Sequence, residues 1–431
     1  MKQKPSRRKL LVTIGGATVP LAGCMGPSSS DDTESPTDET DTETPSDTDT
    51  PADTDTETET EAPEPEFTRG EVLADFESLD EWGVIAGEMS ADTDTAYAGS
   101  QSVLVEREGD SAGIFKTFPD GLNLMENDLS VAMQLENPAE GKLAVDIFAP
   151  GGRNHAIARR WLPEELDDWV RFDIGYTNES GKPEMTDVNE LRFVVHPVDG
   201  SDVKFRLDDL RLMPKQNERG KVMLTFDDNH KSHYEFAYEE MKKRDMAGVS
   251  ATIPSAVGDV GHTSIGELRE MQGDGWDIVS HPQEMNPSTP LPEMSEEDQR
   301  KIIKETKEWL ELKGFSKGAK YFVTPFDQMG DETLDIVQEH HEMGFLFGAC
   351  NNAAPPSGRH NVSRVYGISD DIQAAQKQIK LASRRDQMAV LAFHDIGPDA
   401  EISKEDFTSL LDTIEEHDVD VVTASDVEEM Y

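Results

Sequence analysis

The order of apolar and polar residues divides the chain into two parts with different periods. In residues 67–214, short segments alternate apolar and polar side chains, and turn residues (Gly, Pro, Asn and Asp) separate them. Five such segments begin at residues 130, 142, 169, 191 and 203. Period-two runs divided by turns are typical of antiparallel strands that pack face to face. We therefore predict an all-β sandwich over residues 67–214.

After residue 219 the period changes to an alternation of strands and helices. The strand-like segment VMLTF (222–226) is followed by a helical pattern, and this unit repeats to the end of the chain. Ser295 with Asp298 forms a helix-start signature before the longest helical segment. Alternating strands and helices build a parallel sheet, and this many units favour a closed form. We predict a multi-domain chain with a distorted (β/α) barrel at 219–431.

The first 24 residues have the features of an export signal. Arg7 and Arg8 precede an apolar stretch that is shorter than the ~20 residues needed to span a bilayer. The pair resembles a twin-arginine signal, and the residues before Cys24 resemble a lipobox. We expect lipidation of Cys24 and anchoring at the extracellular face of the membrane; the alternative is a chance basic start with an ordinary buried cysteine. Cys350 is the only other cysteine, so the exported chain has no internal disulfide framework.

Residues 25–66 consist almost wholly of Ser, Thr, Pro, Asp and Glu and contain no strand or helix pattern. Sixteen acids and no base lie within residues 31–66. A segment that repels itself and has little to bury stays extended. We predict a disordered linker between the anchor and the sandwich.

The acidic charge is not confined to this linker. The chain has 88 acidic and 40 basic side chains; without the sixteen acids of the linker and the five bases of the signal, 72 acids and 35 bases remain. Such a surface excludes nucleic acid as a partner, because phosphate binding needs a basic footprint. It resembles the surfaces of proteins from extreme halophiles, in which salt screens self-repulsion. An acidic protein of ordinary salt is the alternative.

Polar residues follow several strands of the predicted barrel. Asp227 and Asp228 come after VMLTF, His281 after DIVS, Thr324, Pro325 and Phe326 after AKYFV, and His394 after MAVLAF. Active sites of such barrels lie at the carboxyl ends of the strands. Acids and histidines gathered there suit a hydrolytic divalent cation, which would also neutralise the adjacent carboxylates.

The segments TFDDNHKSHYEFAYEEMKKRDMAGVSATI and VLAFHDI resemble motifs of the polysaccharide deacetylases, the NodB-type carbohydrate esterases. The resemblance implies that Asp227 is the general base and that Asp228 and His281 bind a divalent metal, most often zinc. It further implies that Phe326, after Thr324 and Pro325, lends a backbone N–H to the oxyanion. Leu391 would line the acetyl pocket, and His394 would be the general acid.

Two departures from the family pattern affect the expected site. The second metal histidine is replaced by Met285 in SHPQEMN, and a thioether is a poor ligand for such a cation. Three interpretations stay open: a third ligand from Glu284, Asn286 or Asp327, a water in its place, or loss of catalysis.

The third motif also lacks its arginine, and Arg364 in NVSRVYG is the candidate to pair with Asp227 and lower its pKa. The alternative for Arg364 is a surface salt bridge. The other histidines lie on predicted helices or polar loops, and we expect them to be solvated; His230, next to Asp228, is the one exception to check.

The sandwich segments LADFESLDEWGV, AYAGSQSVLVE and FRLDDLRL resemble jelly-roll carbohydrate-binding modules. The resemblance implies a structural calcium held by Glu77 and Asp209, and the alternative is a solvated acidic face. Trp82, Trp161 and Trp169 are candidates for stacking on sugar rings, although most tryptophans of a sandwich are core.

These patterns together predict a lipid-anchored, exported metal-dependent enzyme of haloarchaeal type that removes N-acetyl or O-acetyl groups from a polysaccharide. The competing hypothesis is a glycan-binding or structural lipoprotein that keeps the barrel as a scaffold. The sequence sets neither the glycan nor the oligomeric state.

Overall fold

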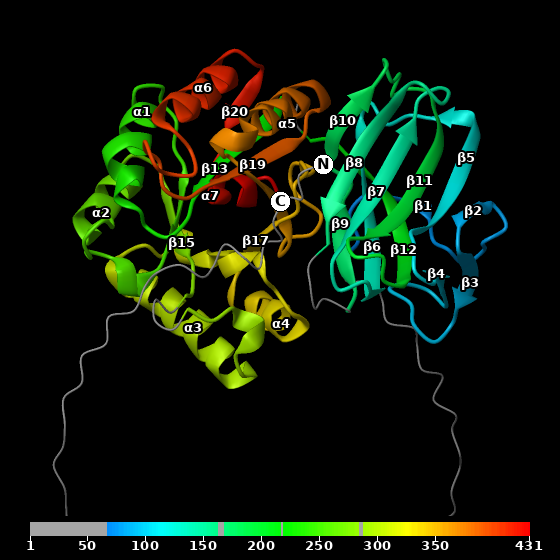
Figure 1. Cartoon of the computed structure of the whole chain (residues 1–431), viewed down its shortest axis with the longest axis horizontal. Coiled ribbons are helices and arrows are strands. Elements are labelled where there is room, and N and C mark those ends of the chain that lie inside the picture. Colours follow the sequence, from blue (N-terminus) through cyan, green and yellow to red (C-terminus); the bar gives the residue numbers. More distant parts are fainter. Residues whose placement is uncertain (1–66, 163–167, 217–218, 284–287) are drawn as a thin grey trace, which may run out of the picture. The chain divides into compact units, whose positions relative to one another are not determined.

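The structure is a computed structural model that describes residues 67–162, 168–216, 219–283 and 288–431 (Figure 1). The predicted export signal, Cys24 and the acidic linker lie outside these residues. Within them, no helix has both the length and the apolar character required to cross a membrane.

The first part of the described chain is a sandwich of two six-stranded antiparallel sheets. One sheet has the order β3-β4-β12-β6-β9, with β1 paired to β12, and the other has the order β10-β8-β7-β11-β5-β2. The strands of the first sheet are β1 (Glu71–Ala74), β3 (Glu88–Asp92), β4 (Ser102–Arg107), β6 (Asn127–Asn137), β9 (Val170–Asp173) and β12 (Val203–Pro214). Those of the second are β2 (Trp82–Ala86), β5 (Ala112–Leu122), β7 (Gly141–Phe148), β8 (His155–Trp161), β10 (Tyr176–Ser180) and β11 (Val188–Pro197).

The period-two pattern explains which face of each strand is buried. In β11, Leu191, Phe193 and Val195 are fully buried between the sheets, while the residues that alternate with them, Glu190, Arg192 and Val194, are partly exposed. Side chains of successive residues point to opposite faces of a strand, so one strand supplies both core and surface. The predicted all-β sandwich is confirmed.

The second part is a parallel barrel. Its strands follow the order β14-β15-β16-β17-β18-β19-β13-β20, and an additional pairing between β14 and β13 closes seven of them into a ring. The strands are β13 (Gly220–Phe226), β14 (Val249–Thr252), β15 (Asp277–Ser280), β16 (Tyr321–Val323), β17 (Met343–Phe347), β18 (Val362–Tyr366), β19 (Met388–Phe393) and β20 (Val419–Val421). The predicted (β/α) barrel is therefore confirmed.

Helices surround this ring (Figure 1). A π-helical turn (His233–Tyr238) leads into α1 (Glu239–Lys242). The other helices are α2 (Ile265–Gly273), α3 (Glu296–Lys313), α4 (Asp331–His340), α5 (Ile372–Arg385), α6 (Lys404–Glu415) and α7 (Ala424–Glu428). As predicted, Ser295 caps α3, because its side chain accepts a hydrogen bond from the Asp298 N–H.

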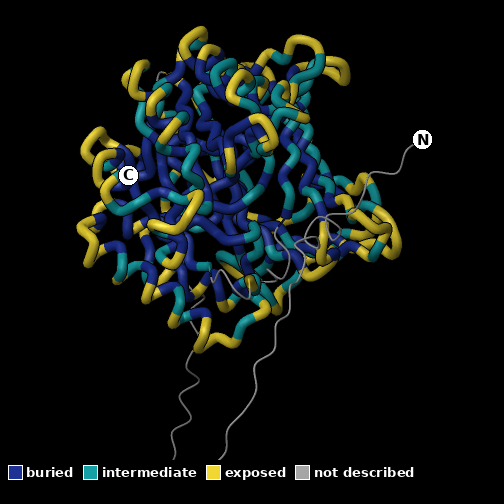
Figure 2. The backbone as a smooth tube through the Cα atoms, turned by 60° about the vertical axis from the view of Figure 1, so that its left-hand side comes forward, coloured by how far each residue is buried: buried dark blue, intermediate teal, exposed yellow. Residues whose placement is uncertain are grey.

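Alternate residues of the barrel strands belong to two different apolar clusters. Leu224 and Leu391 pack with residues of the surrounding helices, such as Phe407 of α6. Met223 and Val390, the neighbours of these leucines in sequence, belong to a second cluster together with residues of the other strands. We assign the second cluster to the inside of the ring. In Figure 2 the buried backbone (dark blue) fills the interior, and exposed segments (yellow) are mostly at the periphery.

The sandwich and the barrel belong to one compact unit, Thr60–Tyr431, and they touch through buried polar groups. The carboxylate of Asp173 in β9 accepts hydrogen bonds from the backbone N–H groups of Ala353 and Ser357. Gly175 lies so close to the Asn351 carbonyl that a Cβ atom there would be 1.6 Å from the oxygen. The contact is thus a fitted interface and not a flexible hinge.

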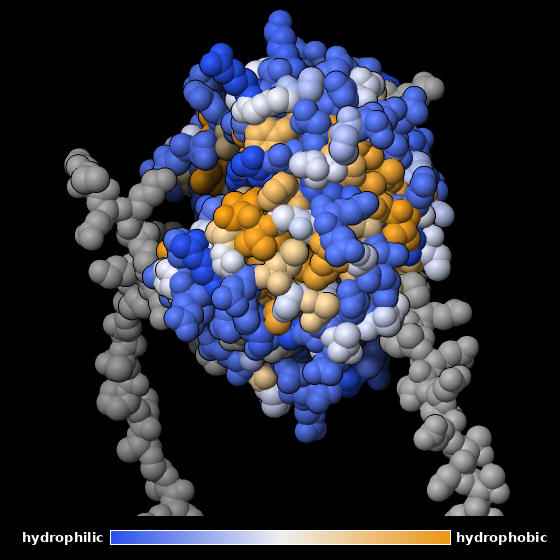
Figure 3. Space-filling model, turned by 90° about the vertical axis from the view of Figure 1, so that its right-hand side faces the viewer, coloured by the Kyte–Doolittle hydropathy of each residue, from blue (hydrophilic) through white to orange (hydrophobic). Residues whose placement is uncertain are grey.

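The surface is a mixture of apolar and hydrophilic side chains. On the face drawn in Figure 3, apolar patches (orange) are interrupted by hydrophilic residues (blue). The large apolar side chains that remain exposed in the described residues include Val84, Ile85 and Val198.

Candidate active site

The candidate residues extend the inward-facing series of their strands. Asp227 follows Met223 and Thr225 at steps of two, and His394 follows Val390 and Ala392 in the same way. His281 continues the series of Val279. Because strands of a parallel barrel all end at one rim, these side chains meet there. The structure thus brings together Asp227, Asp228, His281, Arg364 and His394.

The predicted pairing of Asp227 with Arg364 is present. Arg364 Nη1 lies 3.0 Å and 2.8 Å from the two carboxylate oxygens of Asp227, and both side chains are buried. Burial would raise the pKa of Asp227, but Arg364 and, to a smaller extent, His281 and His394 outweigh it and hold that pKa below its ordinary value. Asp227 is therefore ionised at neutral pH, and the alternative of a surface salt bridge for Arg364 is wrong.

Arg364 also reaches a second carboxylate. Its Nη2 lies 3.0 Å from Asp327 Oδ1, and the hydroxyl of Tyr366 donates to the other oxygen of Asp327. One cation thus joins two acids that belong to different loops of the rim. Asp327, a candidate third metal ligand in the sequence, is occupied by Arg364 and Tyr366. Tyr366 was not predicted, although it follows Arg364 at the inward-facing step of two.

Asp228 and His281 form a second pair. Asp228 Oδ1 lies 3.4 Å from His281 Nε2, while His281 Nδ1 is 2.8 Å from the carbonyl oxygen of Val323. This bond fixes the ring and leaves Nε2 directed at Asp228. Burial lowers the pKa of His281, but the hydrogen bond to Asp228 and the two carboxylate charges outweigh it, so the pKa is raised. Burial raises the pKa of Asp228, and His281 more than reverses that effect.

The donor types of this pair suit a zinc-like cation. A carboxylate oxygen faces an imidazole nitrogen whose partner nitrogen is held by a carbonyl, which is the usual arrangement of metal-binding histidines. In the described residues, however, no group of three or more His, Cys, Asp or Glu side chains is arranged to hold a metal. Glu284 and Met285 lie outside the described residues. Asp228 and His281 therefore fit two ligand positions of a metal site. His230 Nε2 lies 3.9 Å from Asp228 Oδ2, and the described residues place no third ligand beside the pair.

His394 has a partner that the sequence did not reveal. Its Nδ1 lies 2.9 Å from Glu401 Oε2, and its Nε2 lies 4.0 Å from Asp227 Oδ2. Burial lowers the pKa of His394, but the bond to Glu401 and the charges of Asp227 and Asp228 raise it to about 9. The imidazole is therefore protonated at neutral pH. Glu401 lies in a loop seven residues after His394, and no periodic spacing in the sequence predicts that the two side chains meet.

A second histidine supports the backbone at this point. His233 is fully buried, and its Nε2 lies 2.8 Å from the carbonyl oxygen of His394. Burial lowers the pKa of His233 to about 3, so the ring is neutral. The expectation that His233 is solvated is wrong, because the π-helical turn that begins there faces the barrel.

Four residues of the rim have strained backbone. Phe326 and Asp327 have φ of 58° and 54°, and Asp228 and Asn229 have φ of 69° and 59°. Non-glycine residues seldom adopt positive φ, and such residues cluster at functional sites. Asn229 holds its turn in place, because its side chain accepts a 2.6 Å hydrogen bond from the Ile253 N–H. Next to Phe326, Thr324 and Pro325 are buried in the turn that follows β16.

Comparison with known families identifies this part of the chain. Residues 215–344 match the family described as polysaccharide deacetylase. This part of the chain is a polysaccharide deacetylase domain. The match includes Asp227, Asp228 and His281 but ends before Arg364 and His394, whose place in the site comes from the structure. Comparison with curated proteins returned no match.

Solved structures resemble each part of the chain. The Xyl-CE4 domain of a multidomain xylanase from the hindgut metagenome of Trinervitermes trinervoides is 14% identical, with 49% of this chain and 91% of that chain covered and a TM-score of 0.36. A family 4 acetyl xylan esterase from Clostridium thermocellum in complex with a cobalt ion is 19% identical (48% and 90% covered, TM-score 0.34). A family 11 carbohydrate-binding module of Clostridium thermocellum is 17% identical (34% and 94% covered, TM-score 0.28). These TM-scores are below 0.5, so the assignment of the deacetylase domain rests on the family match.

One predicted residue is not at the rim of the deacetylase domain. Leu391 is fully buried in the apolar cluster that joins the strands to the helices. It lies three residues before His394 and therefore on the opposite face of β19. The prediction that Leu391 lines an acetyl pocket is wrong.

The predicted calcium ligands of the sandwich have other partners. Asp209 is buried and paired with two guanidinium groups, those of Arg171 and Arg211. Glu77 accepts hydrogen bonds from Ser100 and from the Gln101 N–H. A carboxylate whose oxygens are both bound by arginine side chains is not available to calcium, so the prediction is wrong for Asp209.

The three candidate tryptophans of the sandwich differ in burial, and Trp82 is not an open platform for sugar rings. Trp82 is buried and stacks on Phe76 with ring centroids 4.8 Å apart. The ammonium of Lys142 lies 4.0 Å from the centroid of the Trp161 ring. Trp169 is half-buried against the edge of Tyr97. Trp82 is therefore a packing residue of the core, which is the usual role of a tryptophan in a sandwich.

Proposed function

We propose that the chain hydrolyses N-acetyl or O-acetyl groups of a polysaccharide. The observation that supports this most is the pairing of a base and an acid on one rim. Asp227, ionised and held by Arg364, lies 4.0 Å from the protonated imidazole of His394. A base with a lowered pKa beside an acid with a raised one is the arrangement that general acid–base hydrolysis needs.

In the proposed reaction Asp227 accepts a proton from water as the water oxygen bonds to the acetyl carbon. We assign stabilisation of the developing oxyanion to the Phe326 N–H, and His394 then donates its proton to the leaving nitrogen or oxygen as that bond breaks. Arg364 keeps the Asp227 carboxylate in place, and Glu401 keeps His394 charged. A divalent cation held by Asp228 and His281 would supply Lewis-acid polarisation and lower the pKa of water.

The test measures acetate released from an N-acetylated oligosaccharide and from acetylated xylan, together with the metal content of the purified protein. Asp227→Asn should reduce release by a factor of about 10² to 10⁴, the usual contribution of a general base. Metal content should stay unchanged in this variant. Asp418→Asn, which changes an exposed acid elsewhere on the domain, serves as the control. Equal acetate release by wild type and Asp227→Asn would contradict the proposal.

A second candidate function is glycan binding without catalysis. It is favoured by one observation: the described residues place two metal donors on the rim and no third. A protein that binds glycans, contains no metal and releases no acetate would support it.

We also propose that the protein is exported by the twin-arginine route, anchored through Cys24 and adapted to high salt. The acidic surface and the N-terminal pattern support this proposal. Replacement of Arg7 and Arg8 by Lys should block secretion, and unchanged secretion would contradict the route.

A further inference from the structure

One arginine of the sandwich is buried against the barrel. Arg160, next to the last residue of β8, is 4% exposed, and its Nη2 lies 2.5 Å from the carbonyl oxygen of Asn361. Its Nη1 lies 3.9 Å from Cys350 Sγ, and its guanidinium carbon lies 4.5 Å from the centroid of the Phe172 ring. Asn361 and Cys350 belong to the barrel, and Phe172 belongs to the sandwich. The guanidinium thus lies in the interface between the two parts.

The turn that Arg160 approaches is Gly348–Ala349, directly after β17. A Cβ atom on Gly348 would lie 3.5 Å from the Arg160 guanidinium carbon and 2.5 Å from Ser363 Oγ, so the turn is packed between these two side chains. The backbone N–H of Trp161 donates to the Gly348 carbonyl oxygen at 2.9 Å. Ala349 has φ of 58°, which non-glycine residues keep only where the surrounding contacts hold it. The sandwich therefore holds this strained turn with a side chain and a backbone donor.

The same turn holds the backbone of Arg364. The N–H groups of Gly348 and Ala349 lie 3.3 Å and 3.0 Å from the Arg364 carbonyl oxygen. Both N–H groups of the turn thus meet the residue whose guanidinium pairs with Asp227 and Asp327. A displacement of the turn is therefore transmitted to the Arg364 backbone and to the place of its guanidinium.

The sandwich also meets the loop that carries Asp327. Leu162, directly after β8, is buried in the same apolar cluster as Met329, which lies two residues after Asp327. The Asp168 N–H lies 3.4 Å from the carboxylate of Asp331, the first residue of α4. One edge of the sandwich thus supports two loops of the barrel, the one after β16 and the one after β17.

We propose that Arg160 is a positioning residue of the deacetylase site. Its guanidinium holds the Gly348 turn, the turn holds the Arg364 carbonyl, and Arg364 keeps the Asp227 carboxylate where it accepts a proton from water. Arg160 touches no reacting atom and acts only through Arg364. A misplacement of about 1 Å, even when it starts far from the chemistry, costs about a hundredfold in rate. The catalytic consequence rests on the proposed function, whereas the hold on the turn does not.

A second buried arginine of the same interface separates positioning from simple stabilisation. Arg385, the last residue of α5, is 8% exposed, and its Nε lies 2.7 Å from Glu179 Oε1 in β10. Arg385 comes three residues before β19 begins, so it lies at the amino ends of the strands, opposite the rim. Both arginines join the sandwich to the barrel, but only Arg160 lies against the turn after β17. Loss of Arg385 should therefore weaken the interface without moving the rim.

The test compares Arg160→Met with Arg385→Met in the full chain. Arg160→Met should lower kcat for acetate release by about ten- to a hundredfold with KM unchanged, because a misplaced base slows the chemical step and leaves substrate binding intact. Amide hydrogen exchange of peptides that cover 343–366 should become at least about tenfold faster in this variant. Arg385→Met should match the wild type in both measurements, although chemical denaturation should show a loss of stability.

Each outcome decides the proposal. It is overturned if Arg160→Met has the kcat of the wild type, if exchange over 343–366 is unchanged, or if Arg385→Met gives the same two changes. Should Arg160→Met fold poorly, Arg160→Lys, which keeps the charge but loses the planar fork, should give both changes to a smaller extent. A wild type that releases no acetate contradicts the proposed function, and the exchange comparison then decides by itself whether Arg160 holds the turn.

Discussion

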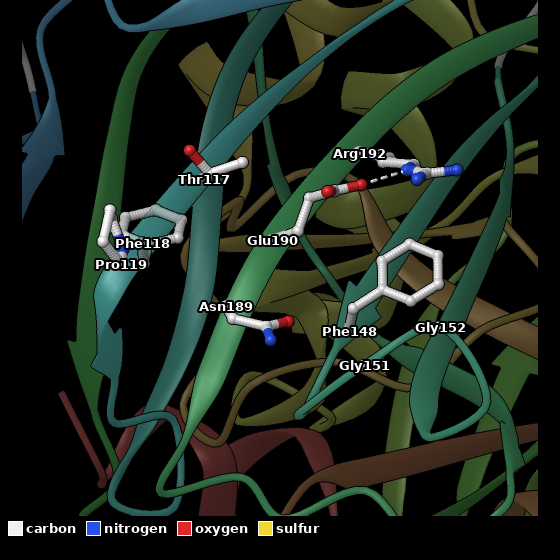
Figure 4. Close-up of a pocket in the computed structure, with 9 residues that line it drawn as sticks. All are labelled: Thr117, Phe118, Pro119, Phe148, Gly151, Gly152, Asn189, Glu190 and Arg192. Atoms are coloured by element: carbon white, nitrogen blue, oxygen red, sulfur yellow. Dashed lines mark hydrogen bonds and ion pairs between the residues drawn. The ribbon is translucent and has the colours of Figure 1, made fainter.

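The rim of the deacetylase domain and a groove of the sandwich lined by Phe148, Glu190 and Arg192 (Figure 4) each contain an arginine paired with a carboxylate, but in opposite surroundings. The Arg364 and Asp227 side chains are 2% and 3% exposed, whereas Arg192 and Glu190 are 43% and 22% exposed. Burial strengthens the electrostatic interaction within a pair and fixes its geometry, and both effects suit proton transfer. A half-exposed pair is weak as an ion pair, because water screens it. The same two kinds of side chain therefore organise a reactive rim in one place and form a surface contact in the other.

The largest expected difference comes from removing each arginine. Arg364→Met should lower the free energy of unfolding by about 3–5 kcal/mol, because it leaves the buried Asp227 and the partly buried Asp327 without their cation. Arg192→Met should change it by less than about 0.5 kcal/mol. Chemical denaturation of both variants measures this. Equal losses would show that burial does not distinguish the two pairs.

Within the sandwich, Asp209 and its two arginines form a buried counterpart of the half-exposed Arg192–Glu190 pair. Asp209→Asn should lower the free energy of unfolding by about 3 kcal/mol, since two buried arginines lose their partner. The exposed acid Asp94 is the control, and Asp94→Asn should have no measurable effect. A calcium chelator should leave the melting temperature unchanged; a clear drop would contradict our rejection of Asp209 as a calcium ligand.

A smaller effect is expected at Glu401, which is half-exposed although it acts on a rim residue. Glu401 raises the pKa of His394, so Glu401→Gln should lower that pKa, and the protonated acid should be lost at lower pH. The alkaline limb of the acetate-release profile, expected near pH 9, should move down by roughly one unit. The acid limb, set by Asp227, should stay in place. Glu405→Gln is the control, and an unshifted limb would remove Glu401 from the site.

The smallest expected effect concerns the outer end of the rim network. Tyr366→Phe removes the hydroxyl that donates to Asp327 but keeps the ring, which stacks on Phe347 with centroids 4.8 Å apart. The loss in unfolding free energy should be about 1 kcal/mol, the usual net value of one hydrogen bond. Acetate release should fall only severalfold. A loss as large as that of Arg364→Met would mean that Tyr366 and not Arg364 organises the rim.

The sequence predicted those site residues that follow from strand periodicity. Asp227, His281 and His394 each continue an inward series, so the alternation of side chains along three strands is enough to assign their ends to one rim. Leu391 is a counterexample in which the alternation was not applied. Family resemblance assigns it to the acetyl pocket, but its position three residues before His394 puts it on the other face of β19.

Contacts made by loops and by long side chains could not be predicted in this way. Glu401 reaches His394 across a turn, and Asp327 reaches Arg364 from another strand end; neither distance follows from spacing. Arg160 reaches the barrel from the sandwich, which a period-two pattern does not reveal. Periodicity gives the face of a residue, whereas its partner depends on the tertiary fold.

The fitted interface at Asp173 bears on how the protein can be divided for experiments. The backbone amides of Ala353 and Ser357, which belong to the barrel, depend on a carboxylate supplied by the sandwich. A fragment starting at residue 219 would expose these donors and the surface that meets Gly175. Truncation at the apparent domain boundary should therefore yield an aggregation-prone product, and catalytic studies should begin from a fragment that retains both parts.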